Sequence, residues 1–208
     1  MPDATFPHQL KQGSAAIKHL IKSGARASDI FLVGDSAGGA FQHQIWSHIL
    51  HPHPDVEPLV LDAPLGGSYL MSPWSSLSDR KGRIAALDKA KLDILTAMCA
   101  NWGERILKDI SPSDLPYVDA NSAPEGWYKD LDKVAVSRVL TSAGGVEVLR
   151  DEILEQHETL KKHHPRAEIY VQDYGVHNDP YWDIFLRDFR VIDLTKKIID
   201  WLQVGLSE

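Results

Sequence analysis

The chain has 208 residues, of which 43% are hydrophobic and 25% are charged, so it has the composition and length of a globular protein of about one domain. Its formal net charge is -7 and its 22 Lys and Arg residues are scattered, which argues against a nucleic-acid partner. Cys99 is the single cysteine, so no disulfide can form within the chain and no Cys and His spacing indicates a zinc site. No apolar run has the length of a membrane span, residues 1–30 lack the layout of a signal peptide, and we expect a cytoplasmic location.

The first elements in chain order are a helix, a strand, a tight turn and a second helix. Apolar residues recur with helical spacing over residues 10–23, and Gly24 ends that pattern. Residues 29–33 are a short, unbroken apolar run, which is typical of a strand buried on both faces of a parallel sheet. After the glycine-rich turn, Phe41, Ile45 and Ile49 predict the second helix, which the prolines of residues 51–54 end.

The rest of the chain continues the alternation after a less regular middle. Residues 68–71 read as a strand, residues 85–108 as a helix, and residues 109–129, rich in Pro, Ser, Asp and Asn, as a loop. The later elements predicted are strands around 135–142 and 168–173 and helices around 148–162 and 182–203. Strands that alternate with helices predict an α/β fold with a mostly parallel sheet and helices on both faces.

The strongest chemical motif is Gly34-Asp35-Ser36-Ala37-Gly38, placed where a buried strand turns into a helix. Such a turn strains the serine backbone, so we expect glycines at 34 and 38 because their neighbours leave no room for a Cβ atom. Ser36 is then presented as a nucleophile, and the Ala37 N–H becomes an oxyanion-hole donor at the helix N-terminus. The alternatives are a turn that only packs tightly or one that holds a phosphate, but the Gly-Lys-Ser/Thr of a phosphate loop is absent.

His177 is the histidine best placed to act as the base for Ser36. It follows the strand at 167–172 in a loop whose Gly175 and Pro180 allow the ring to fold over the carboxyl edge of the sheet. The other histidines lie on helices or away from the carboxyl end of any predicted strand. A solvent-exposed loop histidine is the alternative interpretation.

The acidic partner of this histidine should follow the preceding strand, since the expected chain order is Ser, acid, His. Glu147 is the first carboxylate beyond the strand and its glycines, and it would hold the tautomer of His177 and stabilise the imidazolium. Asp151 and Glu152, one turn further on, remain alternatives. Glu147 could also be a first-turn carboxylate that only complements the helix dipole.

Four segments resemble the hormone-sensitive-lipase-like branch of the α/β-hydrolases, and especially fungal steryl acetyl hydrolase-like and secondary-metabolism esterases. The glycine-rich turn is similar to the GDSAGG elbow of that branch, and Leu70-Met71-Ser72-Pro73-Trp74 to its strand-ending SPW segment. Residues 142–152 resemble its acid motif, with Glu147 at the catalytic position, and residues 117–127 resemble the segment before the acid strand. The resemblance covers nearly the whole chain.

This resemblance implies an α/β-hydrolase fold, with a helical cap-like or inserted segment around 78–130 in a partial domain of residues 1–208. It implies a serine hydrolase that acts on carboxylic esters, such as acetyl esters of a sterol or secondary metabolite, through Ser36, His177 and Glu147, with no metal or cofactor. The HGGG motif of the family, which supplies further oxyanion donors, has no counterpart before Ser36. We therefore expect the N-terminal strands to be missing, which leaves the strand at 29–34 with an unpaired hydrophobic edge.

A catalytically weak or inactive homologue that binds a ligand or a partner is the alternative function. The expected partner is a small-molecule ester, a homodimer is left open, and membrane association is left open because the N-terminus is expected to be incomplete. Trp74, Trp102, Trp127 and Trp182 are candidates to line an apolar acyl or alcohol pocket, although buried aromatic residues more often belong to the core.

Overall fold

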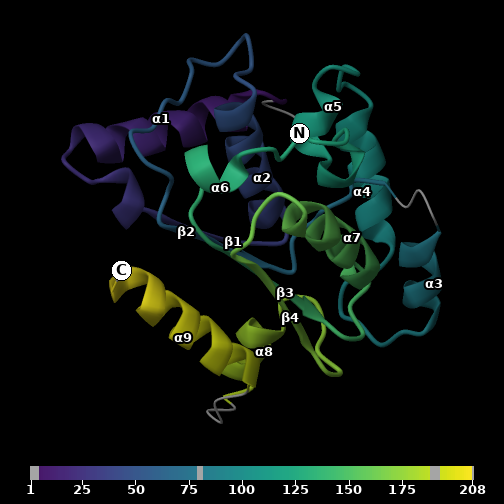
Figure 1. The fold of residues 1–208 in the computed structure, drawn as a ribbon. Coiled ribbons are helices and arrows are strands. Elements are labelled where there is room, and N and C mark those ends of the chain that lie inside the picture. Colours follow the sequence, from purple (N-terminus) through teal and green to yellow (C-terminus); the bar gives the residue numbers. More distant parts are fainter. Residues whose placement is uncertain (1–4, 79–81, 188–192, 208) are drawn as a thin grey trace.

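A four-stranded parallel sheet forms the centre of the protein (Figure 1). The computed structural model describes residues 5–78, 82–187 and 193–207. The strands lie side by side in chain order, and their bounds are Phe31–Asp35 (β1), Gly67–Met71 (β2), Val139–Gly144 (β3) and Ala167–Gln172 (β4). All three strand pairs are parallel, so the four carboxyl ends meet at one edge of the sheet. The α/β class with a parallel sheet is confirmed.

Long helices cover both faces of this sheet (Figure 1). On one face, α1 (His8–Lys22) packs on α2 (Ala37–Leu50), α2 packs on β1 and β2, and α7 (Arg150–Lys161) packs on β3 and β4. On the other face, α9 (Asp193–Ser207) packs on β3 and β4. The α1 helix ends where Gly24 takes a φ of +103° and the Ala25 N–H donates to the Leu20 carbonyl oxygen at 3.1 Å, a cap that glycine makes easily.

The side chains of the two central strands alternate between two hydrophobic clusters. Leu70 and Val139 belong to the cluster under α1 and α2, which also holds Trp46. Tyr69 and Leu140 belong to the cluster under α9, which holds Trp201. Because neighbouring strand residues point to opposite faces, burial in both clusters fixes the register of these strands.

Shorter helices make up most of the remaining described structure. They are the 3₁₀ turns Ala27–Asp29 (η1) and Ala120–Ser122 (η2) and the helices Arg83–Lys89 (α3), Met98–Leu107 (α4), Leu115–Val118 (α5), Leu131–Val134 (α6) and Asp179–Phe185 (α8). Two of these turns, α5 and η2, lie within the predicted loop at 109–129. Among the helices that the structure describes, none combines the length and the apolar composition that crossing a bilayer requires.

The single helix predicted over residues 85–108 is wrong, because the structure has a break between α3 and α4. Lys91 takes a φ of +53°, and the Asp88 carboxylate accepts a hydrogen bond from the Ala97 N–H at 3.0 Å, which closes the segment between the two helices. Helical spacing of apolar residues does not reveal such a break, since a side-chain acceptor can replace the helical hydrogen bond locally. The break leaves Asp93 outside any helix.

The single helix predicted over residues 182–203 is also wrong. The α8 helix begins earlier, at Asp179, and ends at Phe185. Arg187 then takes a φ of +54°, which a continuing helix excludes, and α9 begins at Asp193. Part of this predicted helix, residues 188–192, lies outside the described residues.

The strand before the glycine-rich turn lies at the edge of the described sheet. The apolar run predicted at residues 29–33 is shifted, since β1 spans Phe31–Asp35 and Asp29 lies in η1. Within residues 5–78, 82–187 and 193–207, β1 pairs only with β2, as expected for an unpaired edge. The expected burial on both faces is wrong, because Val33 is 61% exposed.

Candidate active site

Ser36 lies in the tight turn between β1 and α2, and its backbone is strained. Its φ of 50° and ψ of -113° fall outside the regions that residues with a Cβ atom favour. Backbone hydrogen bonds hold this conformation. The Ser36 N–H donates to the Met71 carbonyl oxygen at 2.9 Å, and the Ser36 carbonyl oxygen accepts from the N–H groups of Trp74 at 2.9 Å and Gly39 at 3.0 Å. The end of β2 therefore fixes the turn that presents Ser36.

The turn needs glycine at 34 and 39, and not at 38 as the sequence led us to expect. A Cβ atom on Gly34 would lie 2.7 Å from the carbonyl carbon and oxygen of Gly38, and one on Gly39 would lie 2.6 Å from Pro73 Cβ. A Cβ atom on Gly38 would meet nothing within 4 Å. The crowding comes from the backbone of the first turn of α2 and from the segment after β2.

The first N–H groups of α2 are available to a negative oxygen atom beside Ser36. Within the described part of the chain, the N–H groups of Ala37 and Gly38 have no hydrogen-bond acceptor. This is the usual state of N–H groups in the first turn of a helix, where the helix dipole also favours negative charge. Ala37 thus lies where an oxyanion-hole donor is needed, next to the predicted nucleophile.

The structure brings His177 and Glu147 together. His177 Nδ1 lies 2.6 Å from Glu147 Oε1, which is the distance of a charge-assisted hydrogen bond. Glu147 is completely buried and His177 is 7% exposed. The alternative of an exposed loop histidine is therefore wrong.

Two further donors hold the second carboxylate oxygen of Glu147. Ser72 Oγ donates to Glu147 Oε2 at 2.9 Å, and the Gly144 N–H donates to the same atom at 2.8 Å. Burial raises the pKa of the Glu147 carboxyl, while the hydrogen bonds from His177, Gly144 and Ser72 act in the opposite direction because they favour the carboxylate. A carboxylate with three donors cannot turn away from the histidine without leaving buried groups unpaired.

The other two carboxylates considered from the sequence have different partners. Asp151 Oδ1 accepts a hydrogen bond from Arg150 Nε at 2.8 Å. Glu152 Oε2 lies 3.2 Å from Arg83 Nη2, which also bonds Glu155 and so ties α3 to α7. Of the three candidates, Glu147 is the one in contact with His177.

Ser72 is a site residue that the sequence analysis did not identify by role. It takes a φ of +45° directly after β2, and its hydroxyl makes two bonds at once. Besides donating to Glu147, Ser72 Oγ accepts from the Asn178 N–H at 3.1 Å, so it joins the acid to the histidine loop. The signal in the sequence is the Ser72-Pro73-Trp74 segment, which follows the strand predicted at residues 68–71.

Asp93 is a second such residue, and it lies in the break between α3 and α4. Its Oδ1 atom accepts from the His177 N–H at 2.8 Å, and its Oδ2 atom accepts from the Val148 N–H at 2.8 Å. One carboxylate therefore holds the backbone of both the histidine loop and the acid loop. No local pattern indicated this role, since Asp93 was predicted to lie within a helix.

Ser36 and His177 are connected through their sequence neighbours. Asn178 Nδ2 donates to Asp35 Oδ2 at 3.2 Å, and the Tyr181 hydroxyl donates to Asp35 Oδ1 at 3.2 Å. The structure does not join the two side chains themselves: in the described residues, no hydrogen bond links the Ser36 hydroxyl to the His177 ring. The acid and base are assembled, and the serine lies beside them without that bond.

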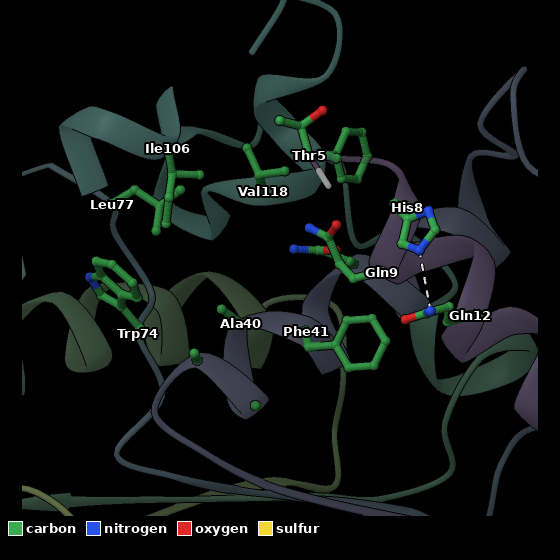
Figure 2. Close-up of a pocket in the computed structure, with 14 residues that line it drawn as sticks. Thr5, His8, Gln9, Gln12, Ala40, Phe41, Trp74, Leu77, Ile106 and Val118 are labelled. Atoms are coloured by element: carbon green, nitrogen blue, oxygen red, sulfur yellow. Dashed lines mark hydrogen bonds between the residues drawn. The ribbon is translucent and has the colours of Figure 1, made fainter. Parts of the chain in front are cut away.

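A cavity of about 560 Å³ opens beside Ala37 and Gly38 (Figure 2). Trp74, Leu77, Ile106 and Val118 line one side of it, and His8, Gln9 and Gln12 of α1 line the other. Of the four candidate tryptophans, Trp74 lines this cavity. Trp182 Nε1 instead lies 3.3 Å from the His177 carbonyl oxygen, Trp127 Nε1 bonds Ser47 Oγ at 2.9 Å, and Trp102 is 47% exposed.

No cluster of possible metal ligands lies near these groups. In the parts of the chain that are described, no three His, Cys, Asp or Glu side chains gather as ligands of one ion. The chemistry that this arrangement can perform is proton transfer by the His177 and Glu147 pair, nucleophilic attack by a serine, and stabilisation of an oxyanion.

Comparison with known proteins agrees with the fold. The family model described as alpha/beta hydrolase fold matches residues 1–179. Among curated proteins, none matches the chain. Among the solved structures that resemble it, a hormone-sensitive lipase from a metagenome library has a TM-score of 0.75 and 18% identity over 99% of this chain. An esterase from the bacterial hormone-sensitive lipase family has a TM-score of 0.72 and 21% identity over 99% of the chain. The esterase EstE5 soaked with p-nitrophenyl butyrate has a TM-score of 0.73 and 18% identity over 100% of the chain. The chain spans 63% of the length of each of these three proteins.

Proposed function

Since the chain belongs to the alpha/beta hydrolase fold family, we propose that it carries the catalytic residues of a carboxylic ester hydrolase, with Ser36 as nucleophile, His177 as base and Glu147 as acid. The observation that supports this most is the buried 2.6 Å contact between His177 Nδ1 and Glu147 Oε1, made beside a strained serine turn. A structural ion pair would not need to lie at the carboxyl edge of the sheet next to such a turn.

In the proposed reaction, His177 Nε2 takes the hydroxyl proton of Ser36 as Ser36 Oγ attacks the ester carbonyl carbon. The negative charge that develops on the carbonyl oxygen is stabilised by the Ala37 N–H, and Glu147 stabilises the imidazolium. The C–O bond to the alcohol breaks as His177 returns the proton to the leaving oxygen. Water then attacks the acyl-enzyme with the same base, which releases the acid and restores Ser36.

We also propose that the substrates are small or medium acyl esters, such as acetyl esters of a sterol or a secondary metabolite. The cavity beside Ala37 supports this, because its lining is mostly apolar and its volume is within the usual range for small-molecule sites. In this proposal residues 78–130 form a cap-like segment, since Ile106 and Val118 from that segment line the cavity.

A catalytically weak homologue that binds a ligand is the second candidate function. One observation favours it: the Ser36 hydroxyl has no hydrogen bond to His177 among the described residues. Because the chain spans 63% of the length of its structural neighbours, both candidate functions are proposals for the protein to which it belongs.

Hydrolysis of p-nitrophenyl acetate and butyrate tests the proposal. We expect Ser36→Ala to lower kcat by at least about a thousandfold, and Ser113→Ala, at an exposed serine outside the site, to have no effect. A fluorophosphonate probe gives a second measurement that does not need turnover: mass spectrometry should find the label on Ser36. Equal hydrolysis rates for Ser36→Ala and the parent chain, together with no labelling of Ser36, would contradict the assignment.

A further inference from the structure

The cavity beside the nucleophile has an apolar part and a polar end. Along α2 it is lined by Ala37, Phe41 and Gln44, which share one helix face. Ala37 and the aromatic ring of Phe41 make the part near Ser36 apolar, together with Trp74, Leu77, Ile106 and Val118 on the opposite side (Figure 2). Gln44 lies further along the helix, and Gln9 and Gln12 of α1 line the same cavity. The polar end is therefore built mainly from amides.

Gln44 is a buried amide without a hydrogen-bond partner. The residue is 7% exposed, its Oε1 atom is buried, and neither amide atom has a partner within residues 5–78, 82–187 and 193–207. A buried amide without a partner is unfavourable because its desolvation is not repaid by a hydrogen bond, whereas an apolar side chain of similar shape carries no such cost. Gln42, two residues earlier, donates to the Tyr69 carbonyl oxygen at 2.9 Å and so has a structural role. The side chain of Gln44 has no such role, although it lines the cavity.

The spacing along α2 sets the distance between the reacting serine and this amide. Gln44 follows Ala37 by two turns, which at 1.5 Å per residue is roughly 10 Å along the helix axis. Among the residues that the structure describes, none that lines the cavity is Asp, Glu, Lys or Arg. A neutral hydroxyl suits such a lining better than a carboxylate or an ammonium group, because an unpaired charge is costly to bury.

We propose that this cavity binds the part of an ester that is apolar next to the ester group and carries a hydroxyl roughly 10 Å further on, where it donates to Gln44 Oε1. This proposal rests on the proposed function, since it takes Ser36 as the reacting residue. The hydroxyl-bearing part is either the acyl chain or the alcohol, and the experiment below separates these two sources.

The test compares ligands that differ only at the far end. In the acyl arm, p-nitrophenyl ω-hydroxyoctanoate is compared with p-nitrophenyl nonanoate, and in the alcohol arm octanediol monoacetate is compared with nonyl acetate. The kcat/KM of each ester is measured with the parent chain, and its Kd is measured by calorimetry with Ser36→Ala, which binds without turnover. A plain apolar pocket would prefer the methyl-terminated member of each pair, because burying a hydroxyl without a partner is unfavourable. The proposed site should instead prefer the hydroxyl-terminated member of a pair.

We expect the hydroxylated member to bind about tenfold more tightly in one of the two arms, which identifies the source. Gln44→Met and Gln44→Leu should abolish or reverse this preference, while Gln203→Leu, at an exposed position on α9, should leave it unchanged. The unfolding midpoint of Gln44→Met should stay constant or rise, since the variant removes an unpartnered amide.

Preference for the methyl-terminated member in both arms, in the parent chain and in Gln44→Met alike, would overturn the proposal. A clear fall in the unfolding midpoint of both Gln44 variants would also overturn it, because the amide would then be held by the fold. If no ester is hydrolysed but the hydroxyl preference in Kd persists and depends on Gln44, this inference stands and the proposed function fails.

Discussion

Replacing Asp93 by alanine removes a single carboxylate that holds two loops of the candidate site. Its oxygens accept hydrogen bonds from the His177 N–H and the Val148 N–H, each at 2.8 Å. Hydrogen bonds to a charged group contribute about 1.5–3 kcal/mol each, so the free energy of unfolding should fall by about 2–4 kcal/mol after partial rehydration of the two N–H groups. Asp93→Asn keeps one acceptor oxygen, so its free energy of unfolding should fall by about half as much as that of Asp93→Ala.

The effect on catalysis should exceed what lost stability explains. Asp93 does not touch the acid or the base side chain, but it sets the backbone of His177 and of the residue after Glu147. A displacement of about 1 Å at a reacting group costs about a hundredfold in rate, so kcat for p-nitrophenyl butyrate should fall tenfold to a hundredfold with little change in KM. The assay is steady-state kinetics at a temperature where urea titration shows each variant to be folded.

The matched control is Asp88→Ala, near the end of α3. Asp88 also binds a backbone N–H, that of Ala97 at 3.0 Å, but it contacts neither loop of the site. This variant should lose about 1 kcal/mol of stability and keep its kcat. If Asp93→Ala lowers kcat no more than Asp88→Ala does, the carboxylate only stabilises the fold and the positioning argument is refuted.

Three further predictions follow from the same contacts. Ser72→Ala should lower kcat/KM about tenfold, because it removes a hydrogen bond to Glu147. The control Ser75→Ala loses a buried hydrogen bond to Gln156 outside the site and should keep its kcat/KM. Equal kcat/KM values for the two variants would contradict a role for Ser72. Burial lowers the pKa of His43 to about 4, so its contribution to stability is complete above about pH 6.5 and is lost as the pH falls toward about 4. Urea titrations across this range should therefore show a steeper acid loss for the parent than for His43→Gln, and parallel curves would refute it. Gly34→Ala should lower the unfolding midpoint markedly and Gly38→Ala only slightly, and the reverse order would contradict the packing of the turn.

The parts of the site that the sequence predicted are those with a local signal. Ser36 was found because a short apolar run, two glycines and a helical period follow one another within about twenty residues. The positions of Glu147 and His177 followed from the ends of two later strands, and the structure places both at the carboxyl edge of the sheet. The four strands and the helices α1, α2 and α7 were predicted for the same reason, since periodicity is a local property, whereas the breaks within the two other predicted helices were not.

The parts that could not be predicted depend on contacts between distant residues. Asp93 meets the His177 N–H across 84 positions of sequence, and Ser72 meets the Asn178 N–H across 106. Nothing near Asp93 distinguishes it from a helix residue, because the groups that its carboxylate binds, the His177 N–H and the Val148 N–H, lie far away in the sequence. The expectation for Gly38 is wrong for a similar reason: the crowding falls on Gly39 and comes from Pro73, in the segment after β2.

Hydrogen bonds hold the acid and the base of the candidate site in place, whereas, in the described ranges of the chain, the hydroxyl of the nucleophile and the oxyanion donor are not bonded. Four groups orient Glu147 and His177, namely Ser72, Asp93, the Gly144 N–H and Trp182. By contrast, the Ser36 hydroxyl and the Ala37 N–H have no partner among the described residues. In the proposed reaction a hydrogen bond from Ser36 Oγ to the His177 ring forms when the ester binds, since catalytic hydrogen bonds are often long or poorly aligned before substrate is present. The rate of the proposed reaction also depends on the Ala37 side, because each N–H donor that faces the oxyanion lowers the barrier.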